Sequence, residues 1–274
     1  MQAIDEAIKQ AADKIREADG ILIMTGAGMG VDSGMPDFRG GEGLWTAYPK
    51  LAHLKVSFVE MCNPQALADN YKMVMGWYAH RLIEFRDTLP HAGFGLLHEI
   101  AEQAPRGGWV YTSNVDGMHQ KAGWPEDKIV ECHGSVHYLQ CEKPCSGTTW
   151  SADPWQPLVD IDECLLTSPD PVCPVCGGRA RPNVMMFGDP QFSFNREQEQ
   201  FWAFHEWARS LKRPVVIEAG AGVTIATVRM MAAEYSDTII RINPQHHEVS
   251  RPNDVGIPLG ALDGISRLYN ELNK

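Results

Sequence analysis

The sequence predicts an α/β protein built on a parallel sheet with helices on both faces, and two observations support this fold class. Five apolar runs of strand length alternate with helical patterns along most of the chain. Three of these runs are followed at once by glycine, asparagine or aspartate, and ligand sites of open α/β sheets lie at the carboxyl ends of strands. The expected strands are 21–25, 109–112, 129–132, 215–219 and 238–242.

The first expected strand runs into a glycine-rich turn that favours a phosphate ligand. Gly26, Ala27 and Gly28 carry no side chain larger than a methyl group, so a ligand can approach the backbone closely. If the turn opens a helix, its free N–H groups suit a pyrophosphate. A tight turn without a ligand explains the glycines equally well. The Pro-Asp-Phe-Arg segment at 36–39 favours the nucleotide site, because a plain turn needs no acid, aromatic ring and guanidinium beside it.

The turn does not fit the glycine fingerprint of hydride-transferring dehydrogenases. Val31 stands three residues after Gly28, where that fingerprint requires glycine or alanine. A dehydrogenase is therefore disfavoured.

Length and charge restrict the class of protein further. A chain of 274 residues suits one large domain with a smaller module. Its net charge of −11 argues against a nucleic-acid surface, which needs clustered cations. The first 15 residues combine helical periodicity with charges, unlike a signal peptide, and no apolar run has the length of a membrane span. We expect a soluble cytoplasmic protein whose partners are small molecules or basic protein segments.

Two insertions interrupt the α/β pattern. Residues 41–90 look largely helical, and residues 137–181 are rich in Cys, Pro, Ser and Gly. We therefore expect a sheet domain at 1–135 and 182–274, with a helical insertion at about 41–90, and a small separate domain at 136–181.

Four cysteines of the second insertion predict a structural zinc site. Cys141 and Cys145 form one close pair, and Cys173 and Cys176 form another. Four thiolates make a closed tetrahedral site that leaves no position for a reacting water. Two disulfides or unconnected buried thiols are the alternatives, and Cys164 between the pairs complicates the choice of ligands. A zinc ribbon for nucleic acid is a further possibility, although the segment has few cations.

Polar side chains at two other strand ends predict a catalytic centre. His133 follows the strand at 129–132, and an imidazole there can accept a proton near neutral pH. Asn114 and Asp116 follow the strand at 109–112, where an amide and a carboxylate could orient ribose hydroxyls. We expect His119 to pack on the helix after Asp116, and His246 and His247 to face solvent.

Taken together, these motifs resemble those of the sirtuins, the family of NAD-dependent protein lysine deacylases, over nearly the whole chain. The matching segments are Gly26–Gly28, 36–39, Asn114-Val-Asp116-Gly117 with His119, His133-Gly-Ser135, the four cysteines, Phe187-Gly188 and Ile242-Asn243. The resemblance implies a Rossmann-like domain, a small structural zinc domain, and NAD as a consumed co-substrate bound with an acyl-lysine protein or peptide. It also implies that the acyl oxygen attacks the nicotinamide ribose, giving free lysine, nicotinamide and O-acyl-ADP-ribose.

The resemblance assigns roles residue by residue. His133 is the expected general base, acting with Asn114 and Asp116 as the catalytic residues. The expected NAD-binding residues are Gly26, Ala27, Gly28, Asp37, Phe38, Arg39, Ser113, Asn114, Asp116, Gly220, Ala221, Gly222, Asn243 and Ala261. Phe187 and Gly188 are expected beside the peptide.

This chain departs from the family pattern at three places, and it also carries a residue pair that bears on the acyl group. The family usually has Ser at Gly30, Gln at Ser113 and Gly-Thr-Ser at 220–222, so donors to NAD are lost. Tyr78 and Arg81 have the Tyr-x-x-Arg spacing of members that favour acidic acyl groups such as succinyl or malonyl. If the position of this pair is counted from residues 63–64 instead, residues 71 and 74 occupy it. The sequence therefore does not decide between acidic and other acyl groups.

Two other functions remain possible at this point. The same pocket could serve mono-ADP-ribosyl transfer or NAD hydrolysis, with a different acceptor. A sensor that binds NAD or ADP-ribose without turnover would agree with the altered positions at Gly30, Ser113 and Ala221. The oligomeric state is not predicted.

Overall fold

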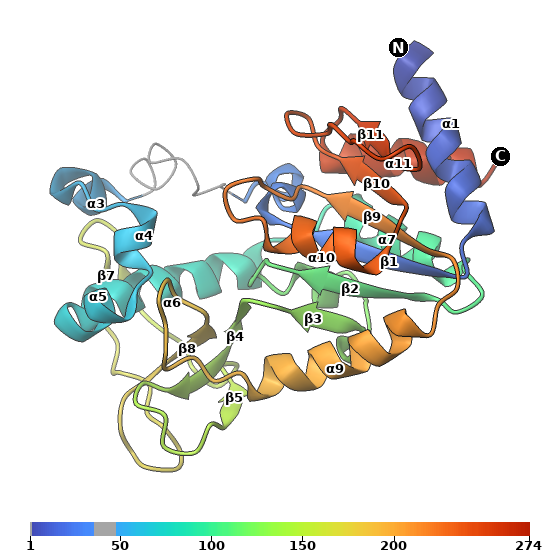
Figure 1. Cartoon of the computed structure of the whole chain (residues 1–274). Helices are drawn as coiled ribbons and strands as arrows, with labels where there is room; N and C mark the ends of the chain where they lie inside the picture. Colours follow the sequence, from blue (N-terminus) through green and yellow to red (C-terminus); the bar gives the residue numbers. More distant parts are fainter. Residues whose placement is uncertain (1, 36–47) are drawn as a thin grey trace.

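The computed structural model describes residues 2–35 and 48–274, and its central layer is a six-stranded sheet (Figure 1). Its strand order is β11-β10-β9-β1-β2-β3, and every neighbouring pair is parallel. The strands are β1 (Gly20–Thr25), β2 (Gly108–Thr112), β3 (Ile129–Glu131), β9 (Pro214–Ala219), β10 (Ile239–Ile242) and β11 (Val255–Ile257). All five expected strands are confirmed, whereas β11 was missed because three residues are too few to form a recognisable pattern.

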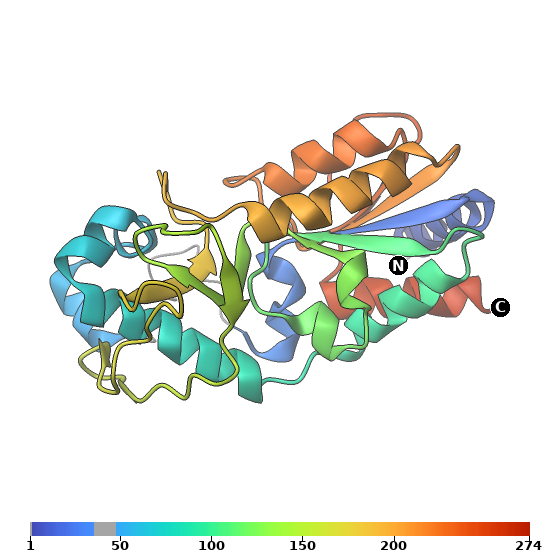
Figure 2. The same ribbon diagram turned by 90° about the horizontal axis from the view of Figure 1, so that it is seen from below.

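Helices cover both faces of this sheet, as the sequence predicts (Figure 2). Because successive side chains of a strand point to opposite faces, Ile21 and Ile23 of β1 join one core and Leu22 and Met24 join the other. The first core includes helices α1 (Gln2–Glu17), α7 (Ala92–Glu102) and α11 (Ala261–Leu272). The second includes α9 (Asn195–Arg209) and α10 (Thr227–Tyr235).

The described part of the first insertion is helical, as expected. It consists of α3 (Pro49–Leu54), α4 (Phe58–Met61), α5 (Pro64–Asp69) and α6 (Tyr71–Asp87). Ser57 and Glu60 form a capping box at the start of α4, and Asn63 caps α5 directly before Pro64. These helices pack against β4 (Gly134–Cys141) and β8 (Ala180–Val184) in a third hydrophobic core.

The second insertion contains short antiparallel strands. A three-stranded sheet in the order β5-β4-β8 is formed by β4 (Gly134–Cys141), β5 (Thr149–Ser151) and β8 (Ala180–Val184). A two-stranded ribbon of β6 (Val159–Asp160) and β7 (Leu165–Leu166) contacts α6. The short helix α8 (Met118–Lys121) and 3-10 turns at Ala27–Met29, Val31–Ser33 and Glu126–Lys128 complete the elements described here. No helix in residues 2–35 and 48–274 has the length and apolar character required to cross a membrane.

Candidate active site

The glycine turn after β1 packs backbone against backbone on the loop that follows β9. The Gly28 N–H donates to the carbonyl of Gly220 at 3.0 Å. A Cβ on Gly26 would lie 2.9 Å from the Cα of Ala221, and a Cβ on Gly28 would lie 2.9 Å from the Cα of Gly220. Gly220 has a φ of +65°, and a Cβ there would stand 2.1 Å from the Met29 nitrogen. These glycines are therefore required by packing, whatever the turn binds.

Asn114 holds the glycine turn from the neighbouring strand. Its side-chain Nδ2 donates to the carbonyl of Gly26 at 3.0 Å, and its backbone N–H donates to Thr112 Oγ1 at 3.1 Å. Thr25 Oγ1 lies 2.8 Å from Thr112 Oγ1 and 3.0 Å from Nε2 of His119, which is buried on α8 as expected. The carboxyl ends of β1 and β2 are thus joined by side-chain hydrogen bonds.

Asp116 is a buried carboxyl group at the same edge of the sheet. Only 7 % of the residue is exposed, and its Oδ1 accepts the Met118 N–H at 3.0 Å. Burial raises the pKa of Asp116 to about 6, opposed by the Met118 hydrogen bond and reinforced by the negative charge of Glu131. His137 fixes the backbone here by donating Nε2–H to the Asp116 carbonyl at 2.9 Å.

Replacing Asp116 with asparagine is expected to stabilise the fold at neutral pH. Below pH 3.8 the carboxyl is protonated in both states. Between pH 3.8 and about 6 the unfolded chain ionises before the folded one, so the folded state loses stability over this range and keeps the full penalty above it. Asparagine removes this penalty and keeps an acceptor for Met118. Urea unfolding should therefore show a gain of about 2–3 kcal/mol at pH 7.5 and a smaller gain at pH 5. A difference that does not change with pH would contradict this.

His133 lies half-buried between β3 and β4, and it lines a cavity of about 410 Å³. Its carbonyl accepts the Met185 N–H at 2.9 Å, which joins the end of β3 to the segment after β8. The cavity brings together residues from several distant parts of the chain. Of the predicted site residues, it is lined by Ala27, Tyr78, Arg81, Ser113, Asn114, Asp116, His133, Phe187 and Gly188.

A second cavity of about 370 Å³ lies on the other side of the glycine turn. Ala27 lines the first cavity and the next residue, Gly28, lines the second. The predicted residues that line it are Gly28, Gly220, Gly222, Asn243 and Ala261. The turn therefore separates two neighbouring cavities, and a ligand that fills both must pass along its backbone. Gly26 and Ala221 pack behind the turn and line neither cavity.

The segment carrying Phe187 and Gly188 is held by a buried ion pair. Arg181 of β8 bonds both carboxylate oxygens of Asp189 at 3.0 and 2.8 Å, and their side chains are 1 % and 0 % exposed. The carboxylate also accepts the backbone N–H groups of Met186 and Gln191. Phe187 itself donates its N–H to the Cys62 carbonyl at 2.8 Å. The segment is thus anchored at both ends, beside the first cavity.

The four predicted cysteines form one cluster. Their sulfur atoms all lie within 4.8 Å of one another, with Cys141 to Cys176 at 3.7 Å and Cys145 to Cys173 at 3.6 Å. Tetrahedral zinc with Zn–S bonds of ~2.3 Å places its sulfurs roughly 3.8 Å apart, so the cluster fits zinc and not disulfides. Cys164 is buried elsewhere and donates toward the Met73 carbonyl. The ligand choice is therefore settled among the described cysteines.

Some predicted residues lie outside the described part of the chain, and some lining residues were not predicted. Asp37, Phe38 and Arg39 fall in the segment 36–47, outside the described residues. Met185 and Met186 were not among the predicted site residues but line the first cavity, although Met186 is also buried. His246 is exposed as expected but borders the second cavity. That these three residues border a cavity depends on how distant segments pack together, which the sequence does not show.

Comparison with known proteins gives a consistent result. The model of the Sir2 family matches residues 26–207. An NAD-dependent protein deacylase of Thermus thermophilus is 29 % identical over 96 % of this chain and 94 % of its own length. A second deacylase of that name from Pyrobaculum aerophilum is 30 % identical over 96 % of this chain and 95 % of its own. Among solved structures, a Sir2 homologue in complex with ADP-ribose is 25 % identical, covers 96 % of this chain and 95 % of its own, and superposes with a TM-score of 0.70.

Proposed function

Since this chain belongs to the Sir2 family, we propose that it removes acyl groups from lysine side chains of proteins and consumes NAD in the reaction. The observation that supports this most is the convergence of His133, Asn114 and Asp116 on one cavity. The glycine turn separates that cavity from a second one, which suits an elongated dinucleotide. Relatives that carry the name NAD-dependent protein deacylase match the chain over nearly its full length.

NAD would extend across both cavities. Its adenosine half would occupy the second cavity, between the glycine loops and Asn243. Its pyrophosphate would lie along the turn at 26–28, and its nicotinamide end would enter the first cavity beside Ser113, Asn114 and Asp116. Asp37, Phe38 and Arg39 belong to this proposal on the sequence alone.

The residues of the first cavity supply orientation and proton transfer. The acyl oxygen attacks the ribose carbon that carries nicotinamide, which leaves, and His133 accepts the proton of a ribose hydroxyl. Asn114 has one N–H on the Gly26 carbonyl, so its other N–H and its oxygen are available to a ligand. With one water consumed, the products are nicotinamide, free lysine and O-acyl-ADP-ribose.

The protein partner would bind beside Phe187 and Gly188. Phe187 is 37 % exposed next to the first cavity, and an extended peptide can pair with such a segment through backbone hydrogen bonds.

The proposal also includes the domain organisation and the compartment. The sheet domain would comprise residues 1–135 and 182–274, and the small zinc domain would comprise residues 136–181. The free thiols of the cysteine cluster suit a reducing compartment such as the cytoplasm.

The activity is tested by incubating the protein with NAD and a panel of acyl-lysine peptides and analysing the products by mass spectrometry. O-acyl-ADP-ribose formed together with the free peptide would support the proposal. Nicotinamide release without peptide, or label transferred from NAD to protein, would indicate hydrolysis or ADP-ribosyl transfer. ADP-ribose binding with no release of nicotinamide would indicate a sensor.

Arg81 is expected to set the preference between charged and uncharged acyl groups. It lines the first cavity with a side chain only 3 % exposed, and burial keeps the neighbouring Tyr78 hydroxyl protonated by raising its pKa. A guanidinium binds a carboxylate by two hydrogen bonds. Arg81→Met should lower kcat/KM for a succinyl-lysine peptide roughly tenfold or more relative to an acetyl peptide.

Glu84 provides the matched control, because its carboxylate forms an ion pair with Arg81 from one turn further along α6. Glu84→Gln releases that guanidinium and should shift the preference toward the succinyl peptide. If Arg81→Met affects both peptides equally, Arg81 does not contact the acyl group.

A further inference from the structure

Two loops without helix or strand form one wall of the second cavity. They follow β9 at residues 220–226 and β10 at residues 243–254. The first loop has alanine and glycine at 221 and 222, so neither of these two residues can fix the loop through a side-chain hydrogen bond. Its conformation depends on bonds that other residues make to its backbone.

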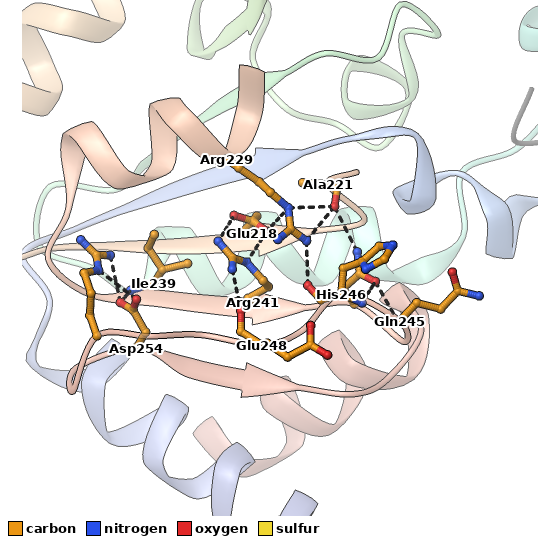
Figure 3. Close-up of polar contacts among 11 residues, drawn as sticks. Glu218, Ala221, Arg229, Ile239, Arg241, Gln245, His246, Glu248 and Asp254 are labelled. Carbon is orange, nitrogen blue, oxygen red and sulfur yellow. Dashed lines mark hydrogen bonds and ion pairs between the residues drawn. The ribbon is translucent and has the colours of Figure 1, made fainter. Parts of the chain in front are cut away.

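Arg229 of α10 bonds to both of these loops. Its Nη2 and Nε donate to the carbonyl of Ala221 at 3.1 and 3.3 Å, and the same Nη2 donates to the carbonyl of His246 at 2.7 Å. Asn243 donates its Nδ2 to the Ala221 carbonyl as well, at 3.1 Å. Figure 3 shows Arg229, Ala221 and His246 meeting at this point. One guanidinium therefore spans both loops.

A buried carboxylate holds this guanidinium in place. Glu218 of β9 is 1 % exposed, lies 3.7 Å from Arg229 Nε, and pairs with Arg241 of β10 through contacts of 2.7 and 3.1 Å. Arg241 in turn donates to the Glu248 carbonyl at 2.8 Å (Figure 3). A buried carboxylate between two cations is well compensated, so Arg229 has a fixed orientation. None of these charged groups lines the first cavity.

We propose that Arg229 is a positioning residue for the adenosine half of NAD, an inference that rests on the function proposed above. It fixes the loops after β9 and β10 in the shape that the adenosine would contact. Arg229 acts through these loops and not on the reacting atoms.

Calorimetric titration of ADP-ribose, together with the steady-state KM for NAD and kcat, tests this inference. In Arg229→Met, the Kd for ADP-ribose and the KM for NAD should rise between about tenfold and a hundredfold, as expected for the loss of hydrogen bonds from a charged donor. The kcat at saturating NAD should change less than about twofold, because the first cavity is intact. Arg229→Lys keeps a charged donor and should recover part of the affinity. Arg229→Gln replaces Arg229→Met if the latter does not fold.

Arg251 offers a matched control, because it lies in the loop between β10 and β11 but bonds at the amino end of β10 and does not line the second cavity. It bonds the Asp254 carboxylate at 2.9 Å and the Ser236 carbonyl at 2.9 Å, while Asp254 accepts the N–H of Ile239 at the amino end of β10. Arg251→Met should therefore lower the Tm and leave ADP-ribose affinity unchanged. Equal loss of affinity in both variants, or wild-type affinity in Arg229→Met, would overturn the inference. Failure of the wild-type protein to bind ADP-ribose would overturn the proposed function as well.

Discussion

Replacing His133 with alanine is expected to lower the rate of deacylation by a factor of roughly 10²–10⁴, the usual contribution of a general base. His133 is the imidazole that lines the first cavity among the described residues, and it stands there with Asn114 and Asp116. Alanine removes the proton acceptor but leaves the glycine turn and the second cavity unchanged. The loss should therefore appear in kcat, measured by mass spectrometry of O-acyl-ADP-ribose.

The binding of ADP-ribose separates this effect from a loss of structure. Its Kd in His133→Ala should stay within about twofold of the wild-type value, because removing a proton-transfer group affects the transition state and not ground-state binding. His98→Ala is a suitable control, since His98 lies on α7 against Trp124 and lines neither cavity. If His133→Ala retains more than about a tenth of the activity, another group is the base.

Replacing Cys173 with serine is expected to have the second large effect, by destroying the zinc site. The binding free energy of structural zinc reaches about 10–16 kcal/mol in small zinc-binding peptides, and the thiol cluster joins the end of β4 to the segment before β8. Because β4 begins next to His133 and β8 ends next to Met185, unfolding of the second insertion should also abolish deacylation. Metal analysis and thermal unfolding of the purified protein measure both effects.

Cys164→Ala is the matched control for the zinc prediction. Cys164 is fully buried in the same part of the chain but packs in the third hydrophobic core and not in the thiol cluster. This variant should keep one zinc per chain even if its Tm falls. Wild-type zinc content and Tm in Cys173→Ser would show that these thiols do not hold the metal.

Strands of the main sheet were predictable because their residues are buried on both faces and so read as continuous apolar runs. β11 was not, since Val255, Gly256 and Ile257 form too short a run. The antiparallel strands of the second insertion were also missed. β5, β6 and β7 have only two or three residues each and are partly exposed, and the pairing of β4 with β8 joins segments far apart in the sequence.

The candidate site was predictable where polar side chains come directly after a strand, as at Asn114, Asp116 and His133. It was not predictable for Met185 and Met186, because an apolar residue that lines a cavity looks the same in sequence as one in the core. Arg229 was missed for a related reason. Its contacts are to backbone carbonyls, and a carbonyl leaves no mark in the sequence of the loop that provides it.

Gly26 and Gly28 show a subtler limit. The sequence associates them with a phosphate ligand, whereas the structure shows that the loop after β9 already excludes a Cβ at both positions. Both causes require the same residue, so composition alone cannot separate them. Only the structure shows that packing between the turn and the loop after β9 is one of the two causes.

The ion pair of Arg181 and Asp189 restricts how this protein can diverge in evolution. Both side chains are shielded from water, and the carboxylate also holds the backbone of the segment at 186–191. A single replacement leaves the other charge buried without compensation, and replacing both with apolar residues leaves two backbone N–H groups without their acceptor. Descendants of this sequence would therefore change the two positions together with residues 186–191, so this wall of the first cavity should change shape by joint replacement more readily than by single substitutions.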